Sequence, residues 1–164
     1  MKAIVMIFKL SIFLTLAIPF RLQAQNPIVA AIKTNRGNLY YPRSVERFYR
    51  QNDYQLVWIA LDTVKTHAAE AMLMLDCVKL YGLSRNDYHP KQLIYDQLHK
   101  LKEPGGTDEE KVLYDILLTD ATIRLMNDLH FGKLNPVYSR AKIDRGMQFK
   151  AGDALKAGIE TRIF

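Results

Sequence analysis

The sequence contains one cysteine, Cys77, and a cysteine thiolate is the nucleophile that several enzyme classes use for acyl transfer. A reactive thiolate needs a neighbouring base or a helix N-terminus to stabilise it. Cys77 lies late in a predicted helix, far from the favourable end of the helix dipole, and no His-Gly pair precedes it. We therefore interpret it as a packed or half-exposed core residue, because free cysteines are usually buried. An independent thiol enzyme is the least favoured function.

The histidines and acids do not form a recognisable metal or acid–base site. His67 and Glu70 share a face of one predicted helix, but two ligands do not hold a metal, so we expect neither a metal nor a cofactor. Asp120 is unusual because it lies in an otherwise apolar stretch, and if buried it needs a partner such as Arg124, one turn further on. Nothing selects a catalytic pair from the other candidates, which are His89, His99, His130, Asp76, Asp115 and Asp128.

Six aromatic residues between positions 40 and 58 could stack on sugar rings if they were exposed. Most of them follow a helical or alternating spacing, which favours burial in the core. Three are named as possible contacts to a glycan or a partner: Tyr40, Tyr41 and Trp58. No glycine-rich phosphate loop and no Gly-x-Ser-x-Gly motif occurs, so the residues alone indicate no active site.

Two long helices must position these residues, because apolar side chains follow a helical period in two segments. The first runs from about Val64 to Tyr81 and stops at Gly82, which suits the left-handed residue after a helix. The second runs from about Asp108 to His130, behind a capping box formed by Thr107 and Glu110. Apolar residues surround much of this second helix, which predicts a central helix packed on both flanks.

Shorter helices are predicted around this centre. One is capped by Ser44, one has Pro90 in its first turn, and a last one begins at Asp153. We expect loop-like structure in 25–43 and irregular structure in 137–152. The fold class is therefore all-α, a compact bundle of about five helices around a central helix near 108–130 with irregular connections.

Individual side chains can also be assigned to the core. The helix after Ser44 should bury Val45, Phe48 and Tyr49. An extended connection over 54–58 should insert Trp58 into the core, and the helix after Pro90 should bury Leu93, Ile94, Leu98 and Leu101. On the two long helices we expect Leu75 and Leu117 to be buried.

The N-terminus resembles a secretory signal peptide. A basic start precedes the apolar run LSIFLTLAIPF, and LQA offers a cleavage site after Ala24. The alternative is an uncleaved membrane anchor, and this segment is the only membrane contact that we expect. We therefore predict an exported, periplasmic protein. The net charge falls from +6 to +3 without residues 1–24 (20 basic minus 17 acidic residues), with no basic run, so we expect no nucleic-acid partner.

Several phrases, taken in order, carry a family resemblance. They are VERFYRQNDYQLVW, YGLSRNDYH and LYDILLTDATIRLMNDLHFGKLNP, and each alone is weak. Together they are similar to the N-terminal scaffold domain of the large periplasmic L,D-transpeptidases, enzymes that cross-link peptidoglycan. The resemblance covers about residues 40–160. With residues 1–24 predicted as the signal peptide, we expect a lead-in segment over 25–39 and an L,D-transpeptidase-like scaffold domain over 40–164.

The resemblance also implies what this chain lacks. In that family the scaffold domain is mainly helical and non-catalytic, while a separate domain carries a Ser-His-Gly-Cys motif whose cysteine takes the acyl group. This motif does not occur here, so we expect no enzyme activity and no role for Cys77 in acyl transfer. The expected partner is peptidoglycan or a catalytic L,D-transpeptidase domain. The chain ends before the family's further extension, so we expect either a front fragment of a transpeptidase or a free-standing scaffold.

Overall fold

The computed structural model describes residues 26–59, 67–103, 106–147 and 149–161. In this part of the chain every regular element is a helix, as predicted, and none has the length and apolar composition to cross a membrane. The predicted signal peptide, residues 1–24, lies outside the described residues. The α-helices are α1 (Pro27–Thr34), α2 (Pro42–Gln51), α3 (Ala68–Asp76), α4 (Tyr95–Lys102), α5 (Asp108–Asn127), α6 (Arg140–Arg145) and α7 (Ala151–Glu160).

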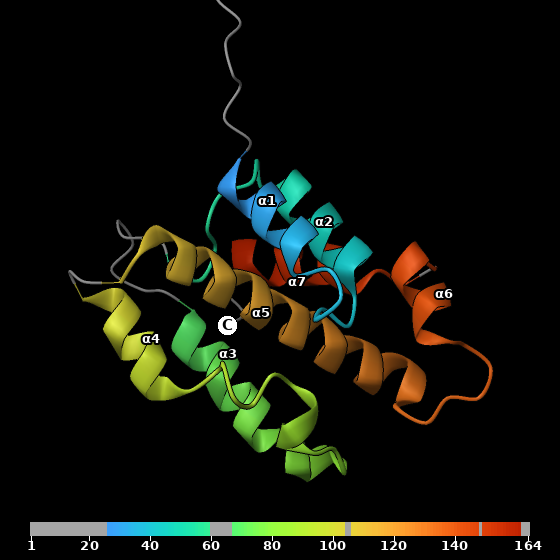
Figure 1. Cartoon of the computed structure of the whole chain (residues 1–164). Coiled ribbons are helices and arrows are strands. Elements are labelled where there is room, and N and C mark those ends of the chain that lie inside the picture. Colours follow the sequence, from blue (N-terminus) through green and yellow to red (C-terminus); the bar gives the residue numbers. More distant parts are fainter. Residues whose placement is uncertain (1–25, 60–66, 104–105, 148, 162–164) are drawn as a thin grey trace, which may run out of the picture.

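The predicted central helix is confirmed as α5, the long diagonal helix of Figure 1. Both halves of the predicted capping box form, because Thr107 accepts from the Glu110 N–H and Glu110 accepts from the Thr107 N–H. Fourteen of its twenty residues are buried, so neighbours must cover more than one side. Helices α1, α2 and α7 pack on one side, and α3 and α4 pack on the other (Figure 1).

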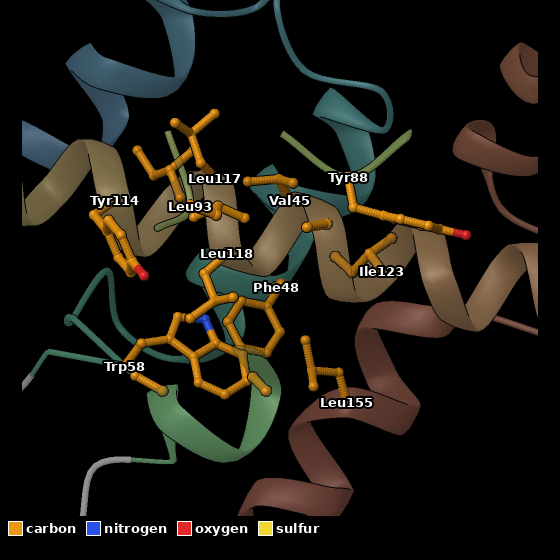
Figure 2. Packing of buried hydrophobic residues seen from close by; sticks show 14 of the residues in the cluster. Val45, Phe48, Trp58, Tyr88, Leu93, Tyr114, Leu117, Leu118, Ile123 and Leu155 are labelled. Atoms are coloured by element: carbon orange, nitrogen blue, oxygen red, sulfur yellow. The ribbon is translucent and has the colours of Figure 1, made fainter. Parts of the chain in front are cut away.

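The helix continues past Asn127 as a π-helical turn, η3 (Asp128–Gly132), and stops at Gly132, which has a φ of +82°. The predicted core residues Leu75 and Leu117 are both buried. Figure 2 shows Leu117, Leu118, Phe48 and Trp58 within the cluster of buried residues. Trp58 is fully buried as predicted, but the connection over 54–58 is not extended throughout, because Tyr54 lies in a turn with a φ of +53° and the chain bends at Val57 and Trp58.

The prediction of a loop over 25–43 is wrong for Pro27–Thr34, which form α1. The Asn26 side chain accepts a hydrogen bond from the Ile28 N–H, and Pro27 occupies the first helical position. Ile28 and Ile32 lie one turn apart and are buried, in a helix that packs on α5. The apolar residues of this helix form one continuous run, so they show no helical period from which the two buried positions could be predicted.

Helix α2 buries Val45, Phe48 and Tyr49 as predicted, but it begins at Pro42, so Ser44 lies in its first turn and is not its cap. The predicted helix from Val64 to Tyr81 is described from Ala68, since its first residues lie outside the described part. It tightens into the 3₁₀ helix η1 (Cys77–Tyr81) and ends at Gly82, whose φ of +70° confirms the left-handed stop.

The first boundary after Gly82 differs from the prediction. Pro90 lies in a turn in which the His89 carbonyl accepts from the N–H groups of Gln92 and Leu93, so α4 begins only at Tyr95. Ile94 is 45% exposed and does not join the core, unlike Leu93, Leu98 and Leu101.

The C-terminal boundaries differ too. Residues 137–152 are not irregular throughout, because Ser139 caps α6 by accepting from the Lys142 N–H. Helix α7 starts at Ala151, so Asp153 lies in its first turn, where it accepts a hydrogen bond from Gln51.

Candidate functional site

Three buried aspartates are the most unusual polar residues of the described structure. Asp115 and Asp120 are fully buried on α5, and Asp144 on α6 is 6% exposed. A buried carboxylate is costly unless hydrogen bonds replace its hydration. Each of the three accepts hydrogen bonds from consecutive backbone N–H groups of the segment 40–59. They therefore act as anchors between the N-terminal segment and the later helices.

Asp115 binds the backbone of the turn that contains Trp58. Its carboxylate accepts from the N–H groups of Val57, Trp58 and Ile59, and from the Tyr49 hydroxyl at 2.5 Å. Burial raises the pKa of Asp115 to about 6, while these donors act in the opposite direction. Burial also raises the pKa of the Tyr49 hydroxyl well above its usual value, and the Asp115 charge adds to this. At neutral pH Asp115 is thus mainly a carboxylate and Tyr49 its donor.

Asp120 does not pair with Arg124, so that expectation is wrong. Its two oxygens accept from the N–H groups of Tyr40 at 2.9 Å and Tyr41 at 2.8 Å, and one lies 2.7 Å from Nε2 of His89. His89 is 8% exposed and has a φ of +46°, which a residue with a Cβ adopts only when its surroundings hold it there. The contact with Asp120 is one of these constraints.

Asp144 was not recognised from the sequence, since its segment was expected to be irregular. Its carboxylate accepts from the N–H groups of Arg43 and Ser44, in the first turn of α2, and from the Ser44 hydroxyl. A carboxylate at this position satisfies N–H groups that have no partner within the helix and interacts favourably with the helix dipole. Asp144 therefore caps α2 from a distant part of the chain.

Arg124 joins the turn 84–89 to the end of α5. It donates to the Asp87 backbone carbonyl and forms ion pairs with the carboxylates of Asp87 and Asp128. The Tyr88 hydroxyl donates to Asp128 at 2.9 Å. Burial is the main reason why the pKa of Asp128 is raised. These charges are satisfied by one another, which favours a structural role.

The three residues named as possible glycan contacts lie in different environments. Trp58 is fully buried and its indole N–H donates to the Thr119 hydroxyl at 2.8 Å. Tyr41 is 4% exposed, and burial raises its pKa to about 12. Neither ring has a free face for a sugar. Tyr40 is partly exposed, and its ring lies 3.8 Å from the Arg124 guanidinium and 5.8 Å from that of Arg140. It remains a possible contact.

Cys77 is exposed in η1, so the expectation of a packed or half-exposed core residue is wrong. Within the described residues its thiol has no hydrogen-bonded histidine or acid. Across the same residues, no group of three or more histidine, cysteine or acidic side chains is arranged to hold a metal ion.

Two small pockets lie on the described surface. One, of about 290 Å³, lies between the turn before α4 and helix α5; the other, of about 170 Å³, lies between α1 and α2. In the first pocket Glu110 is engaged by Lys100, and in the second Glu46 pairs with Arg36. Neither pocket places a nucleophile beside a base, so neither resembles an acyl-transfer site.

Besides Ile94 and Tyr95 at the start of α4, large apolar side chains are exposed in two regions of the described structure. Helix α3 and η1 expose Leu73, Leu80 and Tyr81. The end of α5 and the loop that follows it expose Leu129, Leu134 and Val137. Exposed apolar groups that gather in one region often mark contact surfaces. Neither region could be predicted from the sequence, because apolar periodicity indicates burial and does not reveal which apolar side chains stay exposed.

Comparison with known proteins gives one match. A family model described as a Scaffold domain matches residues 43–161. No curated protein and no solved structure matches the chain.

Proposed function

Since the chain belongs to the Scaffold domain family, we propose that it is a non-catalytic scaffold module of L,D-transpeptidase-type peptidoglycan cross-linking in the cell envelope. The family match covers residues 43–161, most of the part that the resemblance concerns. The signal-like N-terminus supports an exported, periplasmic location. The partner in this proposal is peptidoglycan or a catalytic L,D-transpeptidase domain, and nucleic acid is not among the proposed partners.

One observation carries this proposal. The polar residues within the resembling phrases are bonded to the protein itself, as His89 is to Asp120 and Trp58 is to Thr119. Asp120, from the phrase LLTDA, accepts from two backbone N–H groups. A scaffold requires residues that hold one segment of the chain against another. A catalytic group, in contrast, must face its substrate. The phrases thus support a structural role.

We also propose that the chain alone is not an enzyme. Transpeptidation needs an activated nucleophile, an oriented base and donors for the developing oxyanion. The exposed Cys77 has no base bonded to it among the described residues. We therefore assign the acyl-transfer chemistry to a separate catalytic domain.

The proposal is tested by mixing the purified chain with a separately produced catalytic L,D-transpeptidase domain. Analytical ultracentrifugation should detect a complex, and cross-linking of stem peptides should require the catalytic domain. The Cys77→Ser variant should behave like the wild type in both measurements. Cross-linked product from the chain alone, lost in Cys77→Ser, would overturn the non-catalytic assignment. Absence of a complex would remove the scaffold role.

A second candidate is a free-standing envelope domain that binds peptidoglycan or a partner protein. It is favoured by the partly exposed Tyr40, beside the guanidinium of Arg140. Pull-down with sacculi at low and high salt separates the two: charge-driven binding fades with salt, whereas stacking on sugars persists. Because Trp58 is buried, Tyr40→Ala is the informative variant. Salt-resistant binding that this substitution abolishes would favour the second candidate.

A further inference from the structure

The loop between the end of α5 and α6 exposes two apolar side chains at its tip. Leu134 is 90% exposed and Val137 is 67% exposed. Leu129, one turn before the loop, is 50% exposed. In Figure 1 the loop, drawn in orange, projects from the edge of the molecule before it turns back to α6. The exposed leucine and valine therefore lie on a protruding segment and not in a groove.

The loop is held in shape by Asn135. Its side-chain oxygen accepts from the N–H groups of Val137 and Tyr138, and its amide donates to the Phe131 carbonyl. The Phe131 ring packs edge-on against Tyr138 underneath. These bonds satisfy backbone groups that would otherwise need water. The tip can consequently enter an apolar environment at a lower cost than an open loop.

The segment that contains this tip is rich in basic residues. The segment 133–150 contains five basic residues and one acid, Asp144, which is buried and bonded to the first turn of α2. Lys133 is paired with Asp87. The side chains of Arg140, Lys142 and Arg145 are exposed and form no ion pair with any described residue. The Lys142 ammonium lies 4.9 Å from the Tyr138 ring, which places positive charge directly beside the loop.

We propose that this loop and α6 form a peripheral membrane-binding surface for anionic lipid bilayers. Leu134 and Val137 would enter the boundary between head groups and acyl chains, while Arg140, Lys142 and Arg145 contact lipid phosphates. Tyr138 would lie at the level that aromatic residues favour in a bilayer. This surface goes beyond the proposed scaffold role and does not depend on it. It also differs from the signal segment, the only membrane contact expected from the sequence.

A bilayer fits this surface better than a protein partner does. A stable protein interface buries roughly 800 Å² on each partner, with a well-packed apolar centre. Two side chains on a protruding tip do not provide such a centre. A bilayer needs no complementary shape, and its phosphates match the unpaired positive charge of α6. The combination of an apolar tip with a basic surround is therefore the feature that selects a lipid surface.

A tryptophan reporter tests insertion at the tip. Leu134→Trp should show a blue-shifted emission and quenching by brominated acyl chains in vesicles that contain phosphatidylglycerol. The matched control is Leu80→Trp, since Leu80 is 81% exposed on η1, outside the proposed surface. Its emission should not change. The emission of the introduced tryptophan reports on its own position, so insertion of the loop is distinguished from insertion of the N-terminal apolar segment. Intact mass spectrometry confirms that this N-terminal segment is the same in all variants.

The charge contribution is tested by replacing Arg140, Lys142 and Arg145 together by glutamine. Each cation near an anionic surface changes partitioning by about fivefold, so the triple variant should bind roughly a hundredfold more weakly. The control replaces Lys79, Lys91 and Lys102 by glutamine, which changes the net charge equally at exposed positions elsewhere. It should bind nearly as well as the wild type.

The outcomes decide the proposal without reference to any transpeptidase. Insertion of the Leu134→Trp reporter into anionic vesicles, weakened by salt and by the α6 triple variant, supports it. A reporter that stays in water would overturn it, as would an equal response of Leu80→Trp or equal losses in the two triple variants. Complex formation with a catalytic domain is a separate measurement, so either idea can fail alone.

Discussion

At the scale of single residues, the buried aspartates explain how a helical domain holds its non-helical connections. The N–H groups of Tyr40, Tyr41 and the turn at Trp58 have no helical partner, and carboxylates on α5 accept them instead. Buried backbone donors without acceptors are costly, so these carboxylates take the place of the backbone carbonyls that would accept from these N–H groups in a helix.

Asp120→Ala should lower the free energy of unfolding by about 2–5 kcal/mol, because it leaves two N–H groups and His89 without their acceptor. Urea denaturation measures the change. Asp96→Ala is the control, since Asp96 is exposed on α4 and should shift stability by less than about 0.5 kcal/mol. Equal, small effects of the two substitutions would contradict the anchoring role.

Asp115 should make stability depend on pH. Its pKa of about 6 in the folded state exceeds the value of about 3.9 in an unfolded chain, so the folded state binds the extra proton between these values. The free energy of unfolding should thus rise by roughly 1 kcal/mol as the pH falls from about 7 to 5. Asp128, whose pKa is also raised, acts in the same direction.

Asp115→Asn should lack the part of this pH dependence that Asp115 contributes, whatever its stability at neutral pH. Urea denaturation of both proteins near pH 7 and pH 5 measures the difference. A wild type and a variant with the same slope would show that Asp115 does not bind the proton.

At the scale of elements, the long helices were predictable and the short ones were not. Helix α5 repeats its apolar pattern over several turns, and Gly82 ends η1 where the pattern stops. Helices α1 and α6 offer only one or two buried positions each, which no period can reveal. Their formation depends on tertiary contacts, and those contacts link residues far apart in the chain.

The same distinction applies to the candidate site. The burial of Asp120 could be suspected from its apolar neighbours, but the groups that donate hydrogen bonds to it could not be assigned from helical spacing. Arg124, one turn away, instead pairs with Asp87 and Asp128. The role of Asp144 depends on where α6 lies relative to α2. Spacing along one helix does not contain that information.

Leu117→Ala should destabilise the protein by about 2–5 kcal/mol, because Leu117 is buried on the central helix. The matched control is Leu80→Ala, which removes the same atoms from an exposed leucine and should have little effect. A thermal melt of each variant gives the comparison. Similar melting temperatures would place the buried face of α5 elsewhere.

Gly82→Ala tests the left-handed stop of η1. A Cβ at Gly82 meets nothing within 4 Å, so its cost of about 1–2 kcal/mol comes from the positive φ alone. At Gly37 a Cβ also meets nothing within 4 Å, but no positive φ is required there. Gly37→Ala should therefore be neutral in the same denaturation experiment. Equal costs at both sites would count against a conformational origin.

At the scale of the whole molecule, the N-terminal segment depends on the C-terminal helices. Helix α7 approaches α2 closely, since a Cβ on Gly152 would lie 3.4 Å from the Ser44 carbonyl oxygen and 3.7 Å from Cβ of Phe48. Asp144 on α6 caps the same helix. The described elements thus form one cooperative structure in which the last helices complete the packing of the first ones.

A chain that ends at Ser139 should therefore lose cooperative unfolding, because it lacks both α6 and α7. Far-ultraviolet circular dichroism with increasing urea would show a broad transition in place of a sharp one. The full-length Asp144→Asn variant separates the loss of one acceptor from the loss of two helices, and it should keep a sharp transition at lower urea. A sharp transition in the shortened chain would show that the C-terminal helices are dispensable.

The distance along the chain between the anchored N–H groups and their aspartates has a consequence for biosynthesis. The acceptors lie 56 to 101 residues after the donors, so a ribosome that adds about 5–20 residues per second supplies them roughly 3–20 seconds later. During this interval the acceptors of these N–H groups have not yet been synthesised. A nascent polypeptide that stays extended can thread through a narrow secretory channel, which would suit the leader expected at its N-terminus.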